Sequence, residues 1–495
     1  MEHDNLATNN EQSLWLLERC VPGTGVNNVP FAFRVAGGLR RDVLATALGH
    51  VLDRHPVLRR RFLVEDARLV ISAGQPDTVD LEDITGEVTE FATRPFTVDG
   101  GSLLRVGVAG ELVCVVAHHL VFDALSAFLF GADLAAAYDA VLAGTPLPAP
   151  APAPARTAAS GGEFWRRHLD GFDPAGLALG IATREATTWT LAGAQVTHEL
   201  TPEIANVITR LRKSLRAPDG VLLLAAYYLL LARHGAGPDL VVGAPFTTRD
   251  ESTAKAVGFH VNVAPLRVSV DERASFRDLT RRVREVFLAG LEHRAEQVEV
   301  PADRPAVWRN PVFRHVFNYV PVGAATTFEF GGAPAEVVQL DAAYSKFDLE
   351  FFLLASPERL ALRAVYATEV HDEADVVALL ERYEHLLLAV DTDPDLPIGD
   401  LPSWGTVAPA APAVAVAGSG PVDEALVERL VGLWHEVLGR TDLGPDANFF
   451  DSGGHSLLAA KLAQLAEGAT GVPLTLAEFF AHPTPRALAA HLRGA

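Results

Sequence analysis

The sequence predicts an α+β protein in two lobes that ends in a small all-α domain. Short apolar runs typical of strands occur together with apolar residues at helical spacing throughout residues 1–404. Two stretches rich in Pro and Ala, 145–162 and 405–421, interrupt this pattern and are typical of extended linkers. Beyond the second stretch the patterns are only helical. We therefore expect the following boundaries: an N-terminal lobe at 1–160, a C-terminal lobe at 161–404, a linker at 405–421 and a helical domain at 422–495.

The composition argues against several classes of function. The chain has 41 Lys and Arg residues against 62 Asp and Glu residues, a net charge of −21, which disfavours nucleic acid and anionic membrane surfaces as partners. The longest apolar run, Val221–Ala232, is too short to span a bilayer and predicts a buried helix. The first residues do not resemble a signal peptide, and two cysteines, Cys20 and Cys114, indicate no disulfide framework. We expect a cytoplasmic protein.

The most informative stretch is Glu111–Ser126, which reads E-L-V-C-V-V-A-H-H-L-V-F-D-A-L-S. Its unbroken apolar run predicts a buried strand that ends at two adjacent histidines, His118 and His119. Asp123 follows, and then a helical pattern that places Leu125 among the inward-facing residues. Because neighbouring residues of a strand point to opposite faces, we expect one histidine to face a cavity and the other to face packing.

The residues alone leave three interpretations of the histidine pair open. The first is a hydrogen-bonded core residue, the ordinary role of a buried imidazole, and the second is a metal ligand, although no carboxylate or cysteine cluster accompanies the pair. The third interpretation is a general base, because an imidazole with a pKa of about 6.5 is suited to accept a proton from an attacking amine or hydroxyl. Asp123 then either orients the histidine or forms a buried ion pair that fixes the turn. No G-x-S-x-G nucleophile accompanies the pair, which favours direct transfer.

A second candidate site is Ser456, in the loop D-S-G-G-H-S-L at Asp451–Leu457. Serine is favoured at helix N-termini, so a simple capping role is one interpretation. Gly453 and Gly454 permit a tight turn that exposes the hydroxyl, and a phosphate ester there would lie beside a helix N-terminus, where anions are favoured. We expect this serine to be modified rather than to catalyse.

These motifs together resemble two modules of non-ribosomal peptide synthetases. Residues 1–404 resemble a condensation domain, because A-H-H-L-V-F-D-A-L-S resembles the family motif H-H-x-x-x-D-G. Further family motifs are matched in the expected order by R-H-P-V-L-R-R-R-F, V-G-F-H-V-N-V-A-P-L-R, R-N-P-V-F and S-K-F-D-L. Residues 422–495 resemble the peptidyl carrier protein that follows such a domain, because D-A-N-F-F-D-S-G-G-H-S-L resembles the phosphopantetheine attachment motif.

The resemblance implies a fold and a set of site residues. Residues 1–404 are expected to form two lobes of the chloramphenicol-acetyltransferase type, arranged as a V with a central tunnel, and the carrier a four-helix bundle. The catalytic motif comprises His118, His119 and Asp123. Within it His119 acts on the attacking amine, His118 supports the fold, and Asp123 pairs with Arg249, an arginine expected from the second lobe. Ser456 carries 4′-phosphopantetheine, and no metal is implied.

One residue of the motif departs from the family pattern. Ala124 stands where the motif has glycine, and a side chain at that position disfavours a positive φ. We expect this methyl group to narrow the donor tunnel or to lower activity.

The implied function is amide-bond formation between a donor acyl or peptidyl thioester on an upstream carrier and an acceptor amine on the C-terminal carrier. The alternatives are ester formation, epimerisation of a carrier-bound group, and a degenerate domain that recruits partners. The chain has no room for an adenylation domain, so we expect one to load Ser456 in trans. The other expected partners are a phosphopantetheinyl transferase and a downstream synthetase or thioesterase.

Overall fold

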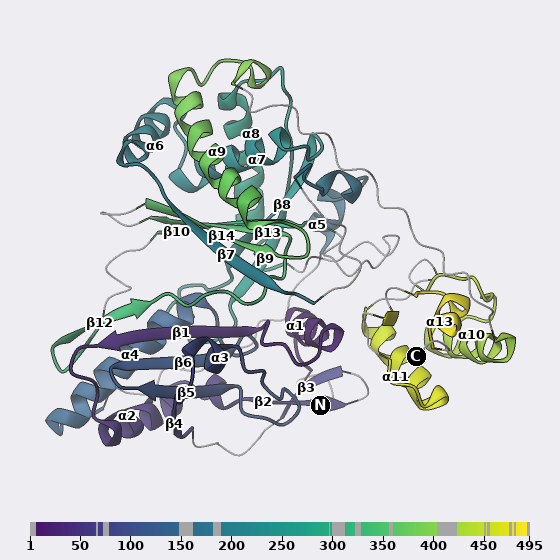
Figure 1. The fold of residues 1–495 in the computed structure, drawn as a ribbon, viewed down its shortest axis with the longest axis horizontal. Helices are drawn as coiled ribbons and strands as arrows, with labels where there is room; N and C mark the ends of the chain where they lie inside the picture. Colours follow the sequence, from purple (N-terminus) through teal and green to yellow (C-terminus); the bar gives the residue numbers. More distant parts are fainter. Residues whose placement is uncertain are drawn as a thin grey trace. The chain divides into compact units, whose positions relative to one another are not determined.

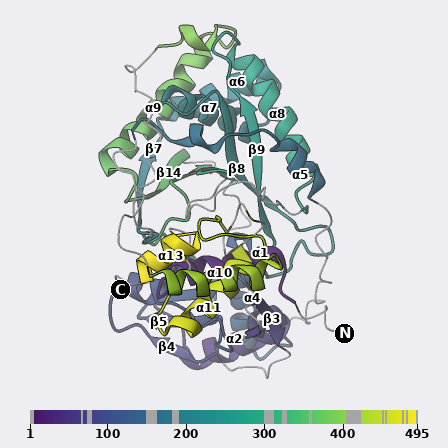
Figure 2. The same cartoon turned by 90° about the vertical axis from the view of Figure 1, so that its right-hand side faces the viewer.

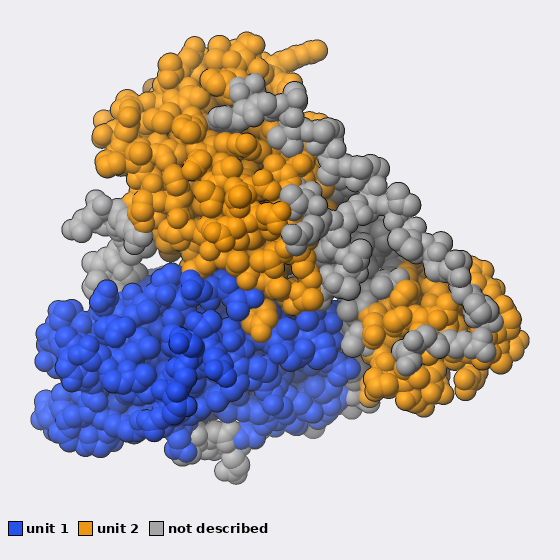
Figure 3. Space-filling model, viewed as in Figure 1, with its two compact units in different colours: residues 1–159, 247–262, 322–343 blue, residues 160–246, 263–321, 344–495 orange. Residues whose placement is uncertain are grey.

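The described residues of the computed structural model form two compact units (Figure 3). The first unit comprises residues 1–159, 247–262 and 322–343, and the second comprises residues 160–246, 263–321 and 344–495. The described residues are 6–65, 68–72, 79–147, 162–181, 190–296, 298, 312–321, 328–355, 360–402, 423–449, 452, 456–474, 478–479 and 482–492. The predicted linker at 405–421 and most of the stretch at 145–162 lie outside them. Two segments from the second half of the sequence therefore belong to the first unit.

The first unit is built on a six-stranded sheet. In spatial order its strands are β11 (Glu329–Phe330), β12 (Ala333–Val338), β1 (Asn28–Val35), β6 (Leu112–His118), β5 (Leu104–Ala109) and β4 (Leu81–Asp83). The remaining elements are α1 (Asn9–Cys20), α2 (Arg41–Arg54), α3 (Val88–Thr93), α4 (Ala124–Ala143) and the hairpin of β2 (Arg61–Glu65) with β3 (Arg68–Ser72).

Both faces of this sheet are covered at its centre. Alternate residues of β6, Val113, Val115 and Ala117, share one hydrophobic core with residues of α2 and α4. The intervening residues, Cys114 and Val116, pack with α3 on the opposite face. Every residue of β6 is buried for this reason, which explains why the strand has an unbroken apolar sequence instead of an alternating one.

Helix α4 is long and apolar enough to cross a membrane by length and composition, and the bent pair α6–α7 passes the same test jointly. Half of the apolar window of α4 is buried within the protein, and the helix packs against α2. These contacts are those of a core helix. Leu125, which the sequence pattern places inward, is instead 43% exposed, because Ser126 and Ala127 form the buried face of the first turn of α4.

The second unit has a mixed six-stranded sheet. Its strands in spatial order are β7 (Gly193–Glu199), β14 (Leu360–Ala367), β13 (Leu349–Ala355), β10 (His315–Pro321), β8 (Asp239–Thr247) and β9 (Val261–Ser269). Its helices are α5 (Glu163–His168), α6 (Pro202–Leu215), α7 (Asp219–Arg233), α8 (Phe276–Glu292) and α9 (Glu373–Thr392). Helices α6 to α9 gather on the same face of the sheet (Figures 1 and 2). Because α7 contacts α6, α8, α9 and β10, it is buried from Val221 to Leu231, as its apolar run predicts.

Two buried tyrosines of the second unit differ in whether the hydroxyl group forms a hydrogen bond, so they test what that bond contributes to stability. The hydroxyl of Tyr227 is buried without a hydrogen-bond partner among the described residues, whereas the hydroxyl of Tyr383 donates to the carbonyl of Leu223 at 2.7 Å. Burial raises the pKa of Tyr227 well above its ordinary value, so the group stays neutral. We expect Tyr227→Phe to stabilise the unit by about 1–3 kcal/mol and Tyr383→Phe to destabilise it by about 1 kcal/mol. Urea unfolding measures both, and equal effects of the two variants would contradict the prediction.

The C-terminal part of the second unit is helical. Its described helices are α10 (Glu424–Leu438), α11 (Ser456–Thr470) and α13 (Pro485–Leu492), and α10 contacts the other two. The rings of Trp434, Phe449 and Phe479 form its core, with centroids 5.2–5.6 Å apart. The α+β class with a helical C-terminal domain, predicted from the sequence, is confirmed.

Candidate active site

The two histidines stand at the end of β6, where the backbone leaves the sheet. The His118 N–H donates to the Leu103 carbonyl at 2.9 Å, and the His119 N–H donates to the Asn27 carbonyl at 2.8 Å. These bonds tie the end of the strand to segments on both of its sides. The position of both imidazoles is therefore set by the centre of the sheet.

His118 is fully buried, and both of its ring nitrogens are engaged. Its Nδ1 accepts the Leu120 N–H at 3.0 Å, so the ring proton lies on Nε2, which donates to the Glu18 carboxylate at 2.7 Å. Glu18 belongs to α1 and also accepts a bond from the Asn27 side chain at 3.1 Å. His118 thus links α1 to the end of β6. Glu18 was not predicted from the sequence.

His119 is partly exposed, and its ring is held in one orientation. Its Nδ1 lies 2.7 Å from the Phe122 carbonyl, and because a carbonyl only accepts, Nδ1 carries the proton. Nε2 is then the nitrogen with the basic lone pair. The edge of the ring meets Phe259, with centroids 5.0 Å apart. This arrangement is suited to accept a proton at Nε2.

Asp123 is a buried anion that forms an ion pair with Arg249. Its carboxylate accepts two bonds from the guanidinium, at 2.7 and 2.9 Å, two from the backbone and hydroxyl of Ser126, at 2.8 and 2.7 Å, and one from the His260 N–H at 3.0 Å. Burial raises the pKa of this carboxyl, but the bonds and charge of Arg249 and the bonds of Ser126 outweigh it, so the pKa lies below its ordinary value. The geometry is that of an ion pair fixing the turn, not of a triad.

Arg249 belongs to the segment 247–262 of the first unit, although it comes from the second half of the sequence. The resemblance implied an arginine from the second lobe, and the compact units assign it to the same unit as the histidines. The hydroxyl of Ser126 accepts the Gly258 N–H at 3.0 Å, which fastens this segment to the first turn of α4. Gly258 has a φ of +155°, and a Cβ there would lie 2.8 Å from Nε2 of His260, so only glycine fits. Ser126, Gly258 and His260 were not predicted as site residues.

Ala124 causes no backbone strain. Asp123 caps α4 in an extended conformation, with φ −134° and ψ 178°, and Ala124 is the first helical residue. The described non-glycine residues with positive φ are Leu191 and Arg216, so Ala124 has an ordinary helical φ. Its methyl group is exposed. The expected conflict with a positive φ is therefore wrong, while the expected effect on the donor tunnel stays a prediction.

Ser456 is the first residue of α11, a helix of 15 residues. The first turn of a helix has backbone N–H groups without intrahelical partners, which favour a phosphate. This backbone position fits a phosphate ester on the serine. Residues 450, 451 and 453–455 of the attachment motif lie outside the described residues. Among the described residues, no group of three or more His, Cys, Asp or Glu side chains is arranged to hold a metal ion.

The hydrogen bond between Glu18 and His118 leads to a testable prediction. We expect Glu18→Ala to lower the stability of the first unit by about 1–3 kcal/mol, because it leaves the buried Nε2–H of His118 without its acceptor. Glu18→Gln keeps an acceptor oxygen and serves as the matched control, with a smaller effect. Hydrogen exchange of β6 and α1 amides measures the change. If both variants were as stable as the original protein, His118 would not depend on this bond.

Comparison with known families assigns the chain to a class. Residues 2–406 match the condensation-domain family and residues 428–492 match the phosphopantetheine attachment site. The chain therefore belongs to the condensation-domain family and is a condensation domain followed by a carrier domain, as predicted. The family is one of amide-forming acyltransferases of non-ribosomal peptide synthetases, and the carrier domain is the kind to which 4′-phosphopantetheine is covalently attached. Secondary metabolism is the corresponding context.

The relatives are subunits of non-ribosomal peptide synthetases. The chain is 27% identical over 432 residues to a linear gramicidin synthase of Brevibacillus parabrevis, covering 79% of this chain and 6% of that protein. It is 28% identical to tyrocidine synthase 2 of the same organism, covering 78% of this chain and 11% of that one. The chain thus spans only a small part of these relatives.

Two solved structures share the fold. The X-domain from teicoplanin biosynthesis has a TM-score of 0.69 at 22% identity, covering 81% of this chain and 98% of that one. The first condensation domain of the calcium-dependent antibiotic synthetase, in complex with a substrate analogue, has a TM-score of 0.64 at 21% identity, covering 80% and 98%. At these identities the likeness concerns the fold alone.

Proposed function

We propose that this chain forms an amide bond between a donor acyl or peptidyl thioester on an upstream carrier and an acceptor amine held on Ser456. The observation that carries the proposal is the orientation of His119. Nδ1 lies 2.7 Å from the Phe122 carbonyl oxygen and therefore carries the ring proton. The basic lone pair is then on Nε2 of a partly exposed ring. A histidine that acts as a general base through Nε2 must carry its ring proton on Nδ1.

The reaction assigns a task to each residue. The 4′-phosphopantetheine arm on Ser456 would supply the thiol that holds the acceptor aminoacyl group as a thioester. The free amine of that group attacks the donor carbonyl carbon, so a C–N bond forms and the donor C–S bond breaks. His119 accepts the proton from the amine at Nε2 and returns it to the leaving thiolate. Asp123 and Arg249 hold the turn that orients His119. Holding both reactants together would supply much of the acceleration.

The remaining expectations are parts of the same proposal. The proposed boundaries are 1–160 for the N-terminal lobe, 161–404 for the C-terminal lobe, 405–421 for the linker and 422–495 for the carrier, although residues 247–262 and 322–343 belong to the first compact unit. The partners are a donor carrier, a separate adenylation domain acting on Ser456, a phosphopantetheinyl transferase and a downstream synthetase or thioesterase. The location is the cytoplasm.

A second candidate function is partner recruitment without catalysis. The X-domain from teicoplanin biosynthesis, which shares the fold, has been solved in complex with OxyB. His118, His119 and Asp123 are all present here, and each of them forms hydrogen bonds in the turn, which supports catalysis over a degenerate domain. Ester formation would use the same His119 with a hydroxyl acceptor.

Intact-protein mass spectrometry tests the proposal. The chain is converted to its holo form, loaded with candidate amino acids and mixed with a loaded donor carrier. A combined mass on this chain supports condensation. A mass unchanged except for loading, together with a stable complex with another protein, would support recruitment instead. Epimerisation would leave the mass unchanged and invert the configuration of the released amino acid.

A further inference from the structure

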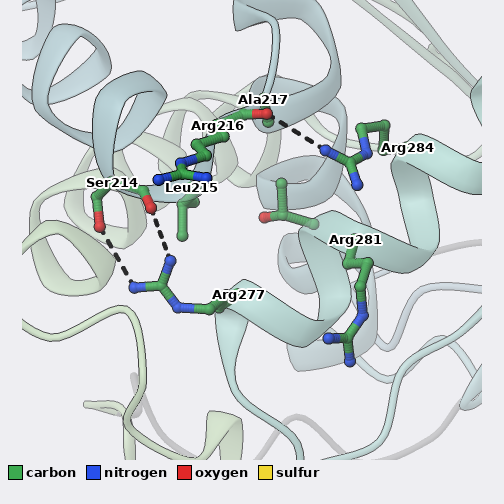
Figure 4. A pocket seen from close by; sticks show the side chains of 8 residues that line it. Ser214, Leu215, Arg216, Ala217, Arg277, Arg281 and Arg284 are labelled. Carbon is green, nitrogen blue, oxygen red and sulfur yellow. Dashed lines mark hydrogen bonds between the residues drawn. The ribbon is translucent and has the colours of Figure 1, made fainter.

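The second unit contains a pocket of about 420 Å³ between the C-terminal end of α6 and one face of α8 (Figure 4). The residues that line it are distant in the sequence from His118 and His119 and belong to the other compact unit. Residues 214–217 line it at the end of α6, and Arg277, Thr280, Arg281 and Arg284 line it from α8. With Arg216, four of the lining residues are arginines and none is acidic, in a chain whose net charge is −21. The proposed condensation reaction uses none of them.

Part of this arginine cluster has a structural explanation. Arg277 donates to the Ser214 carbonyl at 2.8 Å, and Arg284 donates to the Arg216 carbonyl at 3.3 Å. Cations are favoured at the end of a helix, where carbonyl groups lack intrahelical partners. Arg277 is also paired with Asp395 at 2.6 and 3.0 Å, and these bonds hold its side chain in place beside the pocket. Capping of α6 therefore accounts for Arg277 and for one bond of Arg284.

The backbone of Arg216 ends α6, but its side chain is not explained by capping or packing. Its backbone is left-handed, with φ 50° and ψ 45°, at the residue after α6, where glycine is the common choice. The other described non-glycine residue with positive φ is Leu191, whose side chain is buried in the core. The Arg216 side chain is exposed, so it gains no core packing in return for the strained backbone. Strained residues of this kind concentrate at functional sites.

The positive charge at the pocket is only partly compensated. Arg277 pairs with Asp395, and Arg281 pairs with Asp278 at 2.7 Å. Arg216 and Arg284 form no salt bridge with a carboxylate of the described residues. On α8, Arg277, Arg281 and Arg284 recur at spacings of four and three, which places them on the same side of the helix.

We propose that this pocket binds a compact, multiply charged phosphate ligand, such as a pyrophosphate group. Guanidinium groups present paired N–H donors that match the oxygens of a phosphate, and four arginines line one concave volume here. An extended acidic peptide would need a long groove, because alternate carboxylates along a strand are about 7 Å apart. The pocket volume lies within the range of small-ligand sites. The proposal is independent of the condensation activity.

Titration of the full chain with sodium pyrophosphate tests the site, by calorimetry at constant ionic strength maintained with KCl. We expect a dissociation constant of about 1 mM or below. Arg216→Gly and Arg284→Gln should each weaken binding about ten-fold, the range of one charge-assisted bond. Arg282→Gln is the matched control, because Arg282 lies on α8, donates to the Ser269 carbonyl and does not line the pocket. It should bind as the original chain does.

The Arg216→Gly variant separates a ligand-binding role from a structural one. Glycine adopts the left-handed backbone without strain, so the variant should unfold at the same or a higher temperature while binding pyrophosphate more weakly. Unchanged affinity in this variant would overturn the proposal. A parallel titration with a nucleoside triphosphate identifies the source of the phosphate. If the nucleoside triphosphate binds more tightly than pyrophosphate, the site is assigned to nucleotides. Three further results would each overturn the proposed phosphate site. They are the absence of pyrophosphate binding, an equal loss of affinity in Arg282→Gln, and tighter binding of hexaglutamate than of pyrophosphate at equal ionic strength.

Discussion

We expect the His119→Ala variant to lose condensation activity by a factor of about 10²–10⁴ while remaining folded. The loss follows from the position of Nε2, which the bond from Nδ1 to the Phe122 carbonyl leaves as the proton-accepting nitrogen. Truncation of a partly exposed ring removes little core packing, so the free energy of unfolding should change little. Single-turnover formation of the combined donor–acceptor mass on Ser456 measures the rate.

A comparison with Ser456→Ala separates the catalytic centre from the carrier. That variant cannot hold an acceptor, but it should still condense a loaded donor carrier with an aminoacyl thioester supplied in solution. His119→Ala should fail with either form of the acceptor. Product formation at the original rate in the His119→Ala protein would show that the turn positions substrates without acting on the amine. The two variants fail for different reasons, so the result does not depend on how efficiently Ser456 is loaded.

The sequence predicts the strand and its histidines well because local composition decides them. A strand with both faces covered must be apolar throughout, and β6 is buried from Leu112 to His118. The alternation of faces then separates the two imidazoles. His118 continues the face of Cys114 and Val116 and meets Phe96, with ring centroids 6.1 Å apart. These inferences require only the nearest neighbours along the chain.

The partners of these side chains could not be predicted in the same way. Glu18 lies 100 residues from His118 in the sequence, and an isolated glutamate near the end of a helix has no local feature that identifies its partner. The groups that hold His119 and Asp123 in place include a backbone carbonyl and a backbone N–H, which every residue has. Arg249 was predicted through the family resemblance and not through spacing.

The assignment of segments to units was also beyond the sequence patterns. The segment 247–262 is read as part of the second lobe because it follows β8 directly in the chain, yet it belongs to the first unit. What determines its place is a set of non-local bonds: Arg249 with Asp123, and Gly258 with Ser126. The replacement of the motif glycine by Ala124 does not strain the backbone, and the reason again lies in the structure around it. Asp123 occupies the capping position, so the residue after it only has to begin a helix.

The ion pair of Asp123 with Arg249 is expected to have the largest effect on stability. Both side chains are 4% exposed, and the guanidinium lies 2.7 Å from the carboxylate. Asp123→Asn or Arg249→Gln should each destabilise the first unit by about 3–5 kcal/mol, because each leaves an uncompensated buried charge. The double variant should cost less than the sum of the two, since it removes both charges together. Hydrogen exchange of amides in β6 and α4 measures the local free energy of opening.

The pH dependence of the same pair distinguishes charge from shape. The pKa of Asp123 in the folded protein lies below its ordinary value, so the pair stabilises the fold above the unfolded-state pKa of about 3.9. This contribution is lost as the pH falls through the lower, folded-state pKa. The stability difference between the original chain and Asp123→Asn should therefore be full at pH 7 and shrink in acid. A difference that stays constant from pH 7 to well below pH 4 would mean that Asp123 acts through its hydrogen-bond geometry alone, since the neutral amide has no proton to gain in this range.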